Sequence, residues 1–490
     1  MQGAGPPQLG RSGGGTTGYN RPRMSRTRGL AALVLLYLFL AHLVPVPAGI
    51  TPQGWRQTAI FICVIAGMVT EPIHASALVL VGLTAMAING TPVREVLGGF
   101  AEPSVWLVLV AMMIAKMMLD CGLARRIALL FVRLVGKTSL GVAYALQMTD
   151  VTLASGVPSI TARSAGMVLP IGRSIAELFD SHPVGESRKR LGAFLVAAMY
   201  QGSAVACAMF ITGQASNLLG ANLALKLVNV EVTAPSWFAA AIVPGLLSCL
   251  VVPWITYRVL RPEVTYTPEA PTFARSELKK MGPLTRPEWI TLLVFTTVGL
   301  LWLTTVWHRL DVTLVALGGL AVLLVTGTMT WQQAASERSA WDVFIWYGGM
   351  LRMGELLNAT NSTRVFADNV AGIFTGIPWQ VVLIAILMIF FYTHYFFASI
   401  TAHMLAMFPP FVAVLIGIGV PPLLAVYSLL CLANLTAGLT HYGTTTGPIL
   451  FATGYVTRGE WWRVGFLVSV ANMLIWLTVG FAWWKWLGFW

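Results

Sequence analysis

The chain has 490 residues, of which 57% are hydrophobic and only 10% are charged. Because a typical soluble domain is about 25% charged, this composition excludes a soluble multidomain enzyme and a disordered scaffold, and it indicates a polytopic integral membrane protein. The net charge of +12 does not indicate a nucleic-acid partner. The basic residues lie in short segments between apolar runs, which is how charge orients a membrane protein.

The first part of the chain predicts a tail, four spans and an amphipathic helix. Residues 1–28 are rich in Gly, Pro, Ser and Arg, and we expect a disordered basic tail on the cytoplasmic side. Apolar segments of spanning length follow near 30–47, 55–70, 73–90 and 104–120. Segment 122–137 sets basic residues among leucine, isoleucine and phenylalanine, which predicts a helix lying in the membrane interface.

The remaining apolar segments complete an all-α membrane protein with about 11 spans. Further spans are predicted near 191–222, 235–257, 289–306, 312–329, 341–358, 421–455 and 464–486. The longest polar loop is 258–288. The stretches 138–180 and 378–416 do not fit a single span. If the tail is cytoplasmic, every basic cluster falls on the same side and the C-terminus lies outside.

Two halves of the chain repeat. Residues 159–163 read Ser-Ile-Thr-Ala-Arg and residues 399–403 read Ser-Ile-Thr-Ala-His, an offset that also aligns 122–137 with 363–377. It superimposes three further pairs, which are Trp106 and Trp346, Met113 and Met353, and Pro170 and Pro410. Spans 104–120 and 341–358 cross in opposite directions, so the sequence predicts the inverted repeat of secondary transporters, with the substrate near the midplane.

Each repeated motif lies midway along a stretch whose ends we place on one side of the membrane. Such a stretch predicts a re-entrant hairpin with a polar tip, and Gly156 and Pro158 favour a break there. The alternative is two ordinary spans in each stretch. A second polar interruption follows each hairpin, at 212–217 and at 440–448. Paired interruptions in two halves indicate a binding site, because half-helix N-termini attract a carboxylate.

Arg163 is the charge that most needs an explanation, because an arginine at mid-membrane costs about 2.5–3.5 kcal/mol. Its planar fork of donors suits a substrate carboxylate, but a structural pair with Asp150 is the alternative. His403 occupies the matching position in the second copy, and His441 lies in the second interruption, where a histidine is more often a structural donor. The cysteines show no CxxC spacing and the histidines no HExxH spacing, so we expect neither metal nor another cofactor.

Four segments carry a resemblance to a known family. They read VPSITARSAGMVLPI, MFITGQASNLLGANLA, THYFFASITAHMLAMFPPF and NLTAGLTHYGTTTGPILFATGYV. They resemble the divalent anion/sodium symporter family, and most of all its 2-oxoglutarate/malate, citrate/succinate and tartrate/succinate antiporter branch. The resemblance implies a homodimer whose transport domain moves as an elevator against a scaffold. It implies scaffold helices in 29–137 and 289–377, transport elements in 138–257 and 378–490, and the cytoplasmic loop 258–288 between them.

The candidate substrate contacts lie at the hairpin tips and the interrupted helices, where the resemblance implies that di- or tricarboxylates bind. The full set is Ser159, Thr161, Arg163, Thr212, Ser216, Asn217, Ser399, Thr401, His403, His441, Thr444 and Thr445. The family typically has Ser-Asn-Thr at each tip, where the asparagine helps to bind sodium, but this chain has Ile160 and Ile400. Isoleucine has no ligand atom for a hard cation.

We therefore predict sodium-independent exchange of 2-oxoglutarate, malate, succinate, citrate or tartrate across the cell inner (plasma) membrane. Fixed positive charge from Arg163, with His403 as a second candidate, would replace the mobile sodium ion. The alternatives are a sodium-coupled dicarboxylate symporter and a symporter of an inorganic divalent anion such as sulfate. An enzyme is not expected, because no nucleophile or metal spacing accompanies the histidines.

Overall fold

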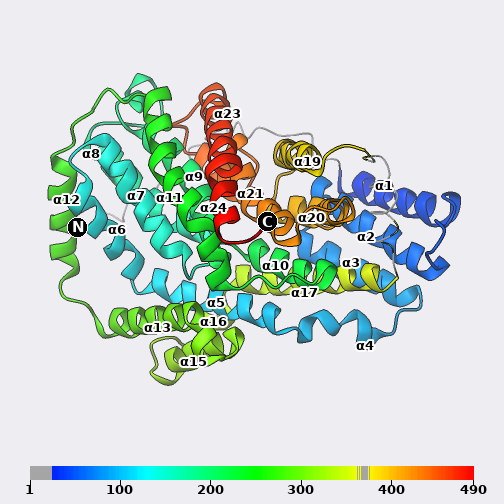
Figure 1. The fold of residues 1–490 in the computed structure, drawn as a ribbon. Helices are drawn as coiled ribbons and strands as arrows, with labels where there is room; N and C mark the ends of the chain where they lie inside the picture. The colour runs from blue at the N-terminus through cyan, green and yellow to red at the C-terminus, as the bar shows by residue number, and fades with distance from the viewer. Residues whose placement is uncertain (1–24, 361, 363–364, 366–373, 375) are drawn as a thin grey trace, which may run out of the picture.

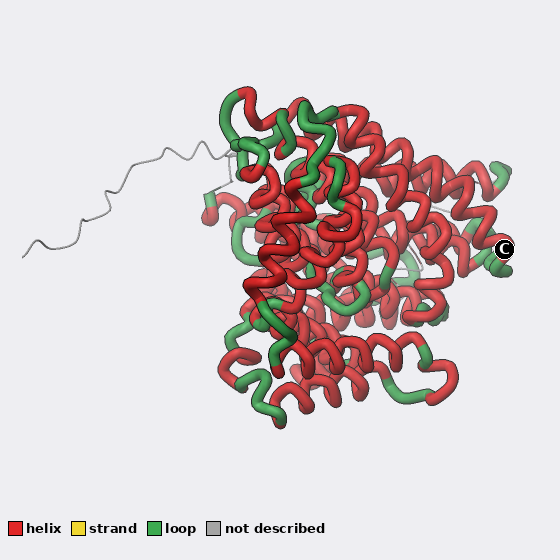
Figure 2. The backbone as a smooth tube through the Cα atoms, turned by 90° about the vertical axis from the view of Figure 1, so that its left-hand side faces the viewer, coloured by secondary structure: helices red, strands yellow, loops and turns green. Residues whose placement is uncertain are grey.

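A computed structural model describes residues 25–360, 362, 365, 374 and 376–490 of the chain. The described part is helical throughout and contains no strand, apart from one isolated bridge between Thr138 and Tyr266 (Figure 2). Most of the predicted tail and most of the second amphipathic segment, 363–377, lie outside the described residues. Within the described part, α1 begins at Arg26, so the boundary predicted for the tail at residue 28 is wrong.

The first part of the chain forms helices that Figure 1 shows in blue to green. They are α1 (Arg26–Leu38), α2 (Pro52–Thr70), α3 (Ala75–Ile88), α4 (Val93–Val96), α5 (Pro103–Asp120), α6 (Leu123–Val135), α7 (Ser139–Ala154), α8 (Leu169–Leu178), α9 (Gly192–Met209), α10 (Ala215–Val228), α11 (Ala234–Val259) and α12 (Glu269–Met281). A π-helical segment, Thr161–Val168, runs directly into α8, and the two together are called arm 1 below.

The rest of the chain continues in the same way from green to red. The helices are α13 (Arg286–Leu303), α14 (Thr305–His308), α15 (Val312–Val325), α16 (Trp331–Ala335), α17 (Arg338–Ala359), α19 (Trp379–Thr393), α20 (Ile400–Gly417), α21 (Pro422–Leu435), α22 (Thr446–Phe451), α23 (Arg458–Ile475) and α24 (Phe481–Trp486).

Eight helical stretches of the described chain are long and apolar enough to cross a membrane. They are Arg26–Leu43, Pro103–Asp120, Gly192–Met209, Ala234–Val259, Trp379–Phe396, Ile400–Gly417, Pro422–Leu439 and Arg458–Trp486. Two shorter apolar helices, α3 and α15, accompany them. The class predicted from composition, an all-α integral membrane protein, is confirmed.

The order of the elements repeats along the chain as the sequence offset predicts. Helix α7 begins at Ser139 and α19 begins 240 residues later, at Trp379. Both are followed by a short irregular tip and then by a second helix, arm 1 in the first copy and α20 in the second. Both predicted interruptions are also present, between α9 and α10 and between α21 and α22. The helix breaks inferred from polar residues in apolar stretches are therefore real.

The amphipathic segment forms α6, but its apolar side is covered by protein. Leu129 and Val132 are buried where α6 packs against α7 and α12. Helix α12 lies within residues 258–288, so the segment predicted as a polar loop contains a helix. An ion pair between Arg125 and Glu277 joins α6 to α12, and a second one between Arg126 and Glu288 joins α6 to the start of α13.

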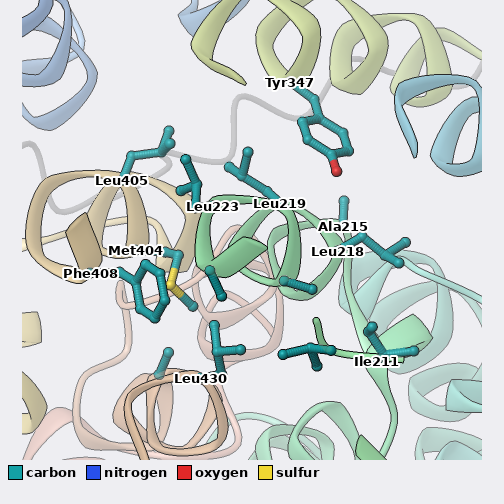
Figure 3. Packing of buried hydrophobic residues seen from close by; sticks show 14 of the residues in the cluster. Ile211, Ala215, Leu218, Leu219, Leu223, Tyr347, Met404, Leu405, Phe408 and Leu430 are labelled. Atoms are coloured by element: carbon teal, nitrogen blue, oxygen red, sulfur yellow. The ribbon is translucent and has the colours of Figure 1, made fainter. Parts of the chain in front are cut away.

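The first interrupted helix is held in the centre of the molecule by apolar packing. Figure 3 shows Leu219 and Leu223 of α10 between α20, α21 and α17, and the facing side chains include Met404, Leu430 and Tyr347. Truncating a leucine in such a core typically costs about 2–5 kcal/mol. This packing fixes where α10 begins, and its first turn belongs to the site described next.

Candidate functional site

Four helix starts meet at one cavity of about 660 Å³. Each start contributes neighbouring residues to its wall: Ser159–Thr161 from arm 1, Gln214–Ser216 from α10, Ser399–Ala402 from α20, and Thr444 and Thr445 from α22. The first N–H groups of a helix have no partner within the helix, and the N-terminal end carries roughly half a positive charge. Four helix starts therefore face the cavity, and within the described structure no lysine or arginine lines it.

The two hairpin tips are built alike. The Ser159 hydroxyl accepts a hydrogen bond from the Ala162 N–H at 3.2 Å, and the Ser399 hydroxyl accepts one from the Ala402 N–H at 3.4 Å. Serine is among the best residues for this capping position, because its oxygen satisfies one orphan donor of the first turn. The repeated motif is thus a helix start in both copies, and both serines line the cavity.

Hydroxyl groups join the first tip to the second interrupted helix. The Thr161 Oγ1 lies 2.7 Å from the Thr445 Oγ1 and 3.0 Å from the Thr446 Oγ1. Thr444 lines the cavity while its hydroxyl accepts a bond from the Gly447 N–H at 2.9 Å. Elements that lie almost 300 residues apart in sequence therefore form one polar surface.

The first interrupted helix is joined to the second half in a comparable way. The side-chain amide of Gln214 donates to the Asn434 Oδ1 of α21 at 2.6 Å. Next to it, the Ser216 hydroxyl is buried and has no hydrogen-bond partner within the described structure. A buried hydroxyl without a partner is costly, so Ser216 is a donor available to a ligand in the cavity.

The opposite wall comes from helices of the predicted scaffold. It includes the α2–α3 connection with Glu71 and His74, Met112 of α5, and Asp342 of α17. His74 Nε2 lies 3.8 Å from the Asp342 carboxylate, and both side chains are well exposed. The cavity thus has donors on its hairpin side and acidic groups towards its mouth.

Arg163 lies behind the tip and does not line this cavity. Its side chain is completely buried and donates to Asp150 Oδ1 at 2.7 Å, to the Val157 carbonyl at 2.5 Å and to the Gly213 carbonyl at 2.6 Å. Asp150 is also buried and accepts a second hydrogen bond, from Ser203. The structure shows the pair with Asp150 that was the structural alternative, and it places Arg163 outside the wall of this cavity.

The Arg163 contacts hold two breaks together. Val157 belongs to the first tip and Gly213 to the first interrupted helix, so one guanidinium ties the tip to the start of α10. Gly213 is tightly placed, because a Cβ added there would lie 2.5 Å from the Cys207 carbonyl oxygen. The guanidinium also reaches the Cys207 sulfur at 3.1 Å.

Two other predicted contacts in the first copy are also structural. The Thr212 hydroxyl donates to the carbonyls of Ala154 and Ser155, which holds the interruption against the tip. The Asn217 side-chain amide donates to carbonyls at the end of α9. Neither residue lines the cavity of the helix starts.

The histidines of the second copy lie outside the cavity wall as well. His403 is completely buried, with its ring centroid 4.5 Å from that of Phe390 and 4.9 Å from that of His394. His394 Nε2 lies 2.8 Å from the Gly443 carbonyl oxygen. His441 accepts a bond from the Trp462 indole at 3.3 Å. Neither His403 nor His441, both predicted as substrate contacts, lines the cavity of the helix starts.

Seven of the twelve predicted contacts therefore meet at one cavity. They are Ser159, Thr161, Ser216, Ser399, Thr401, Thr444 and Thr445. Sequence reasoning missed Gln214, which lies within the quoted interruption, and it missed the acidic mouth. Gln214 carried the same signal as its neighbours, a polar side chain in an apolar stretch. No local sequence signal marks Glu71 and Asp342, because they come together at the cavity only through the packing of α3 against α17.

An all-helical membrane protein with paired hairpin tips and paired interrupted helices around one polar cavity is a secondary transporter. Residues 25–490 match the family described as the sodium:sulfate symporter transmembrane region. The chain belongs to this family, the divalent anion/sodium symporters.

Curated relatives match over nearly the whole chain. The putative malate transporter YflS of Bacillus subtilis is 38% identical over 448 residues, which cover 91% of this chain and 94% of the relative. Dicarboxylate transporter 1 of Arabidopsis thaliana chloroplasts is 39% identical over 91% of this chain and 81% of the relative. The citrate/succinate antiporter of Escherichia coli is 32% identical over 92% and 96%.

Solved structures show the same fold at low sequence identity. Neisseria gonorrhoeae MtrF, described as illuminating a class of antimetabolite efflux pumps, has a TM-score of 0.55 at 14% identity, covering 92% of this chain and 97% of MtrF. The Alcanivorax borkumensis YdaH transporter, described as having an unusual topology, has a TM-score of 0.55 at 14% identity, covering 88% and 98%. These similarities concern the fold alone.

Proposed function

We propose that this protein carries di- and tricarboxylate anions across the membrane by sodium-independent exchange. The observation that carries the proposal is the convergence of four helix starts and their hydroxyls on one cavity. Backbone N–H groups at helix N-termini are suited to carboxylates. Relatives named as malate, dicarboxylate and citrate/succinate transporters support the same class of substrate.

Exchange follows from the charge of the empty site. Arm 1, α10 and α20 are long enough to carry a helix dipole, and at roughly half a charge each their starts amount to about one and a half positive charges. A dicarboxylate dianion balances this charge. An empty cavity leaves that charge uncompensated, so moving it through the low-dielectric membrane is costly. The loaded form then crosses more easily than the empty form. The helix starts therefore take the role predicted from the sequence for the charge of Arg163, because Asp150 already balances that charge.

Independence of sodium is supported by two backbone carbonyl oxygens near the first tip that already accept hydrogen bonds from Arg163. Carbonyl oxygens are typical ligands of hard cations. At the first tip, the carbonyls of Val157 and Gly213 already accept hydrogen bonds from the Arg163 guanidinium. Ile160 and Ile400 offer no oxygen at either tip. A fixed cation thus takes the place that a mobile one would need.

The proposed movement is of the elevator type. The hairpins, the interrupted helices, α11 and α23 form the transport elements, in 138–257 and 378–490. The scaffold consists of the helices of 29–137 and 289–377, and two copies form a homodimer through it. In this proposal the repeats are inverted and the tips are re-entrant. The position of the basic clusters supports a cytoplasmic N-terminus in a cell whose inner membrane holds the protein. The cavity between scaffold and tips then opens towards the cytoplasm.

Counterflow in proteoliposomes tests the proposed function. Vesicles loaded with unlabelled succinate should accumulate labelled succinate without sodium. A panel of 2-oxoglutarate, malate, citrate and tartrate should compete, whereas excess sulfate should not. Competition by sulfate as strong as that by malate would favour an inorganic-anion carrier. Accumulation that requires sodium would favour a sodium-coupled symporter.

A further inference from the structure

A second cavity continues from the first along arm 1. It has a volume of about 360 Å³, and it shares Met112, Ser159, Thr161 and Ser339 with the cavity of the helix starts. From these shared residues it extends along α5 as far as Leu119 and beside the beginning of α17. The two spaces adjoin, so a ligand held at the helix starts faces the second cavity directly.

Lys116 is the one lysine or arginine among the described residues that lines either cavity. It lies on α5, one turn beyond Met112, and its Nζ is 2.5 Å from the Asp120 carboxylate. The side chain is about one-third exposed. An ammonium group has three donors, and within the described structure Asp120 is its only hydrogen-bond partner. Two donors are therefore available to the cavity.

The surroundings of Lys116 distinguish it from a lysine that merely reaches to the membrane surface. A snorkelling lysine lies along apolar surface with its charge in water, whereas Lys116 borders a space that it shares with the hydroxyls of Ser159 and Thr161. Asp120 does not line this space. Its other acidic neighbour is Glu337, which lines the same cavity but lies beyond ion-pair distance. Charged residues of a membrane helix that face an internal cavity typically mark a substrate path.

We propose that Lys116 binds one carboxylate of the substrate in the second cavity, next to the hydroxyls of arm 1 that line both cavities. The anion exchanges places with Asp120 at the ammonium and then moves on to the hydroxyls of arm 1. Lys116 thus sets affinity on the side of the membrane to which the second cavity opens. This inference rests on the proposed function, because it requires a carboxylate substrate.

Counterflow kinetics of matched variants test the role of Lys116. Lys116→Gln keeps a polar chain but removes the charge, and it should raise the KM for succinate up to about fivefold, the upper range for a partly solvated ion pair. The maximal rate should change less than the KM. Lys116→Arg should restore a KM near that of the wild type, and Asp120→Asn should lower the KM because it releases the ammonium.

The control is a lysine with a similar short-range pair away from both cavities. Lys189 contacts Glu186 at 2.7 Å, and Lys189→Gln should leave the KM unchanged. Raising ionic strength should raise the KM of the wild type more than that of Lys116→Gln, because salt screens the charge. A purely structural role would not produce that difference.

The outcomes separate this inference from the function on which it rests. A wild-type protein that shows no succinate counterflow overturns the proposed function itself. If the wild type exchanges succinate and Lys116→Gln has the same KM, only the role of Lys116 is overturned. If Lys116→Gln and Asp120→Asn raise the KM equally, the pair is structural and the role is again overturned. If Lys116→Gln does not fold, Asp120→Asn and the wild type provide the test. The role of Lys116 is overturned if Asp120→Asn does not lower the KM and the KM of the wild type does not rise with ionic strength.

Discussion

The buried pair of Arg163 and Asp150 makes the sharpest prediction about how the site is held together. Both side chains are buried, and the guanidinium bridges the first tip and the first interrupted helix. Removing one member of a buried ion pair typically costs about 3–5 kcal/mol, because the other charge is left uncompensated. Two carbonyls also lose their donor, and an unsatisfied buried group costs about 1–3 kcal/mol. Arg163→Met should therefore unfold much of the protein at ambient temperature.

A double-mutant cycle identifies the cause of that loss. Asp150→Asn should also destabilise, because it leaves Arg163 unpaired, while combining it with Arg163→Met should cost less than the sum of the two single changes. The measurement is thermal unfolding of purified variants in detergent, read as the fraction that remains monodisperse. A stable Arg163→Met protein that folds like the wild type but exchanges no substrate would refute the structural role and assign Arg163 to the substrate.

Three further predictions follow from the site and the α6–α12 contact. Ser399→Ala should lower stability by about 1 kcal/mol through the lost cap and raise the KM for succinate, whereas Ser399→Thr should change both less. Melting curves measure the stability and counterflow measures the KM. An unchanged KM in Ser399→Ala would show that Ser399 does not contact the substrate. Ile160→Asn should leave exchange independent of sodium, because the Arg163 guanidinium still occupies the neighbouring carbonyls; a variant whose counterflow rises with sodium would contradict this. The pKa of Glu277 lies below its ordinary value, mainly through a hydrogen bond from Lys280. Glu277 therefore stabilises the fold above the unfolded pKa of about 4.3 and loses this contribution as pH falls through the folded pKa. Melting temperatures of the wild type and Glu277→Gln should converge on acidification, and a difference that does not shrink as the pH falls would argue against the hydrogen bond from Lys280.

Local signals in the sequence were sufficient for the helix starts. Polar residues within an apolar stretch predict a break, and a break is present at the tip in both copies. The caps that Ser159 and Ser399 form there were not predicted. The offset of the two motifs also predicts the spacing of α7 and α19. These features depend on residues within one or two turns of each other, and so they can be read from the chain itself.

The role of a polar side chain at a break depends on tertiary contacts that no local pattern contains. Thr161 and Arg163 lie two residues apart, but only Thr161 lines the cavity. Arg163 instead donates to the carbonyl of Gly213, which is 50 residues away in sequence. The helix within 258–288 was missed for a similar reason, because α12 has few apolar residues and is stabilised by its contact with α6.

The central claim is that dicarboxylate moves only in exchange for dicarboxylate and without sodium. Uptake of labelled malate into two sets of proteoliposomes, one loaded with succinate and one empty, tests it most directly when each set is measured with and without an inward sodium gradient. The account predicts uptake into loaded vesicles alone, at the same rate in both conditions. Net uptake into empty vesicles that is driven by the sodium gradient would contradict it.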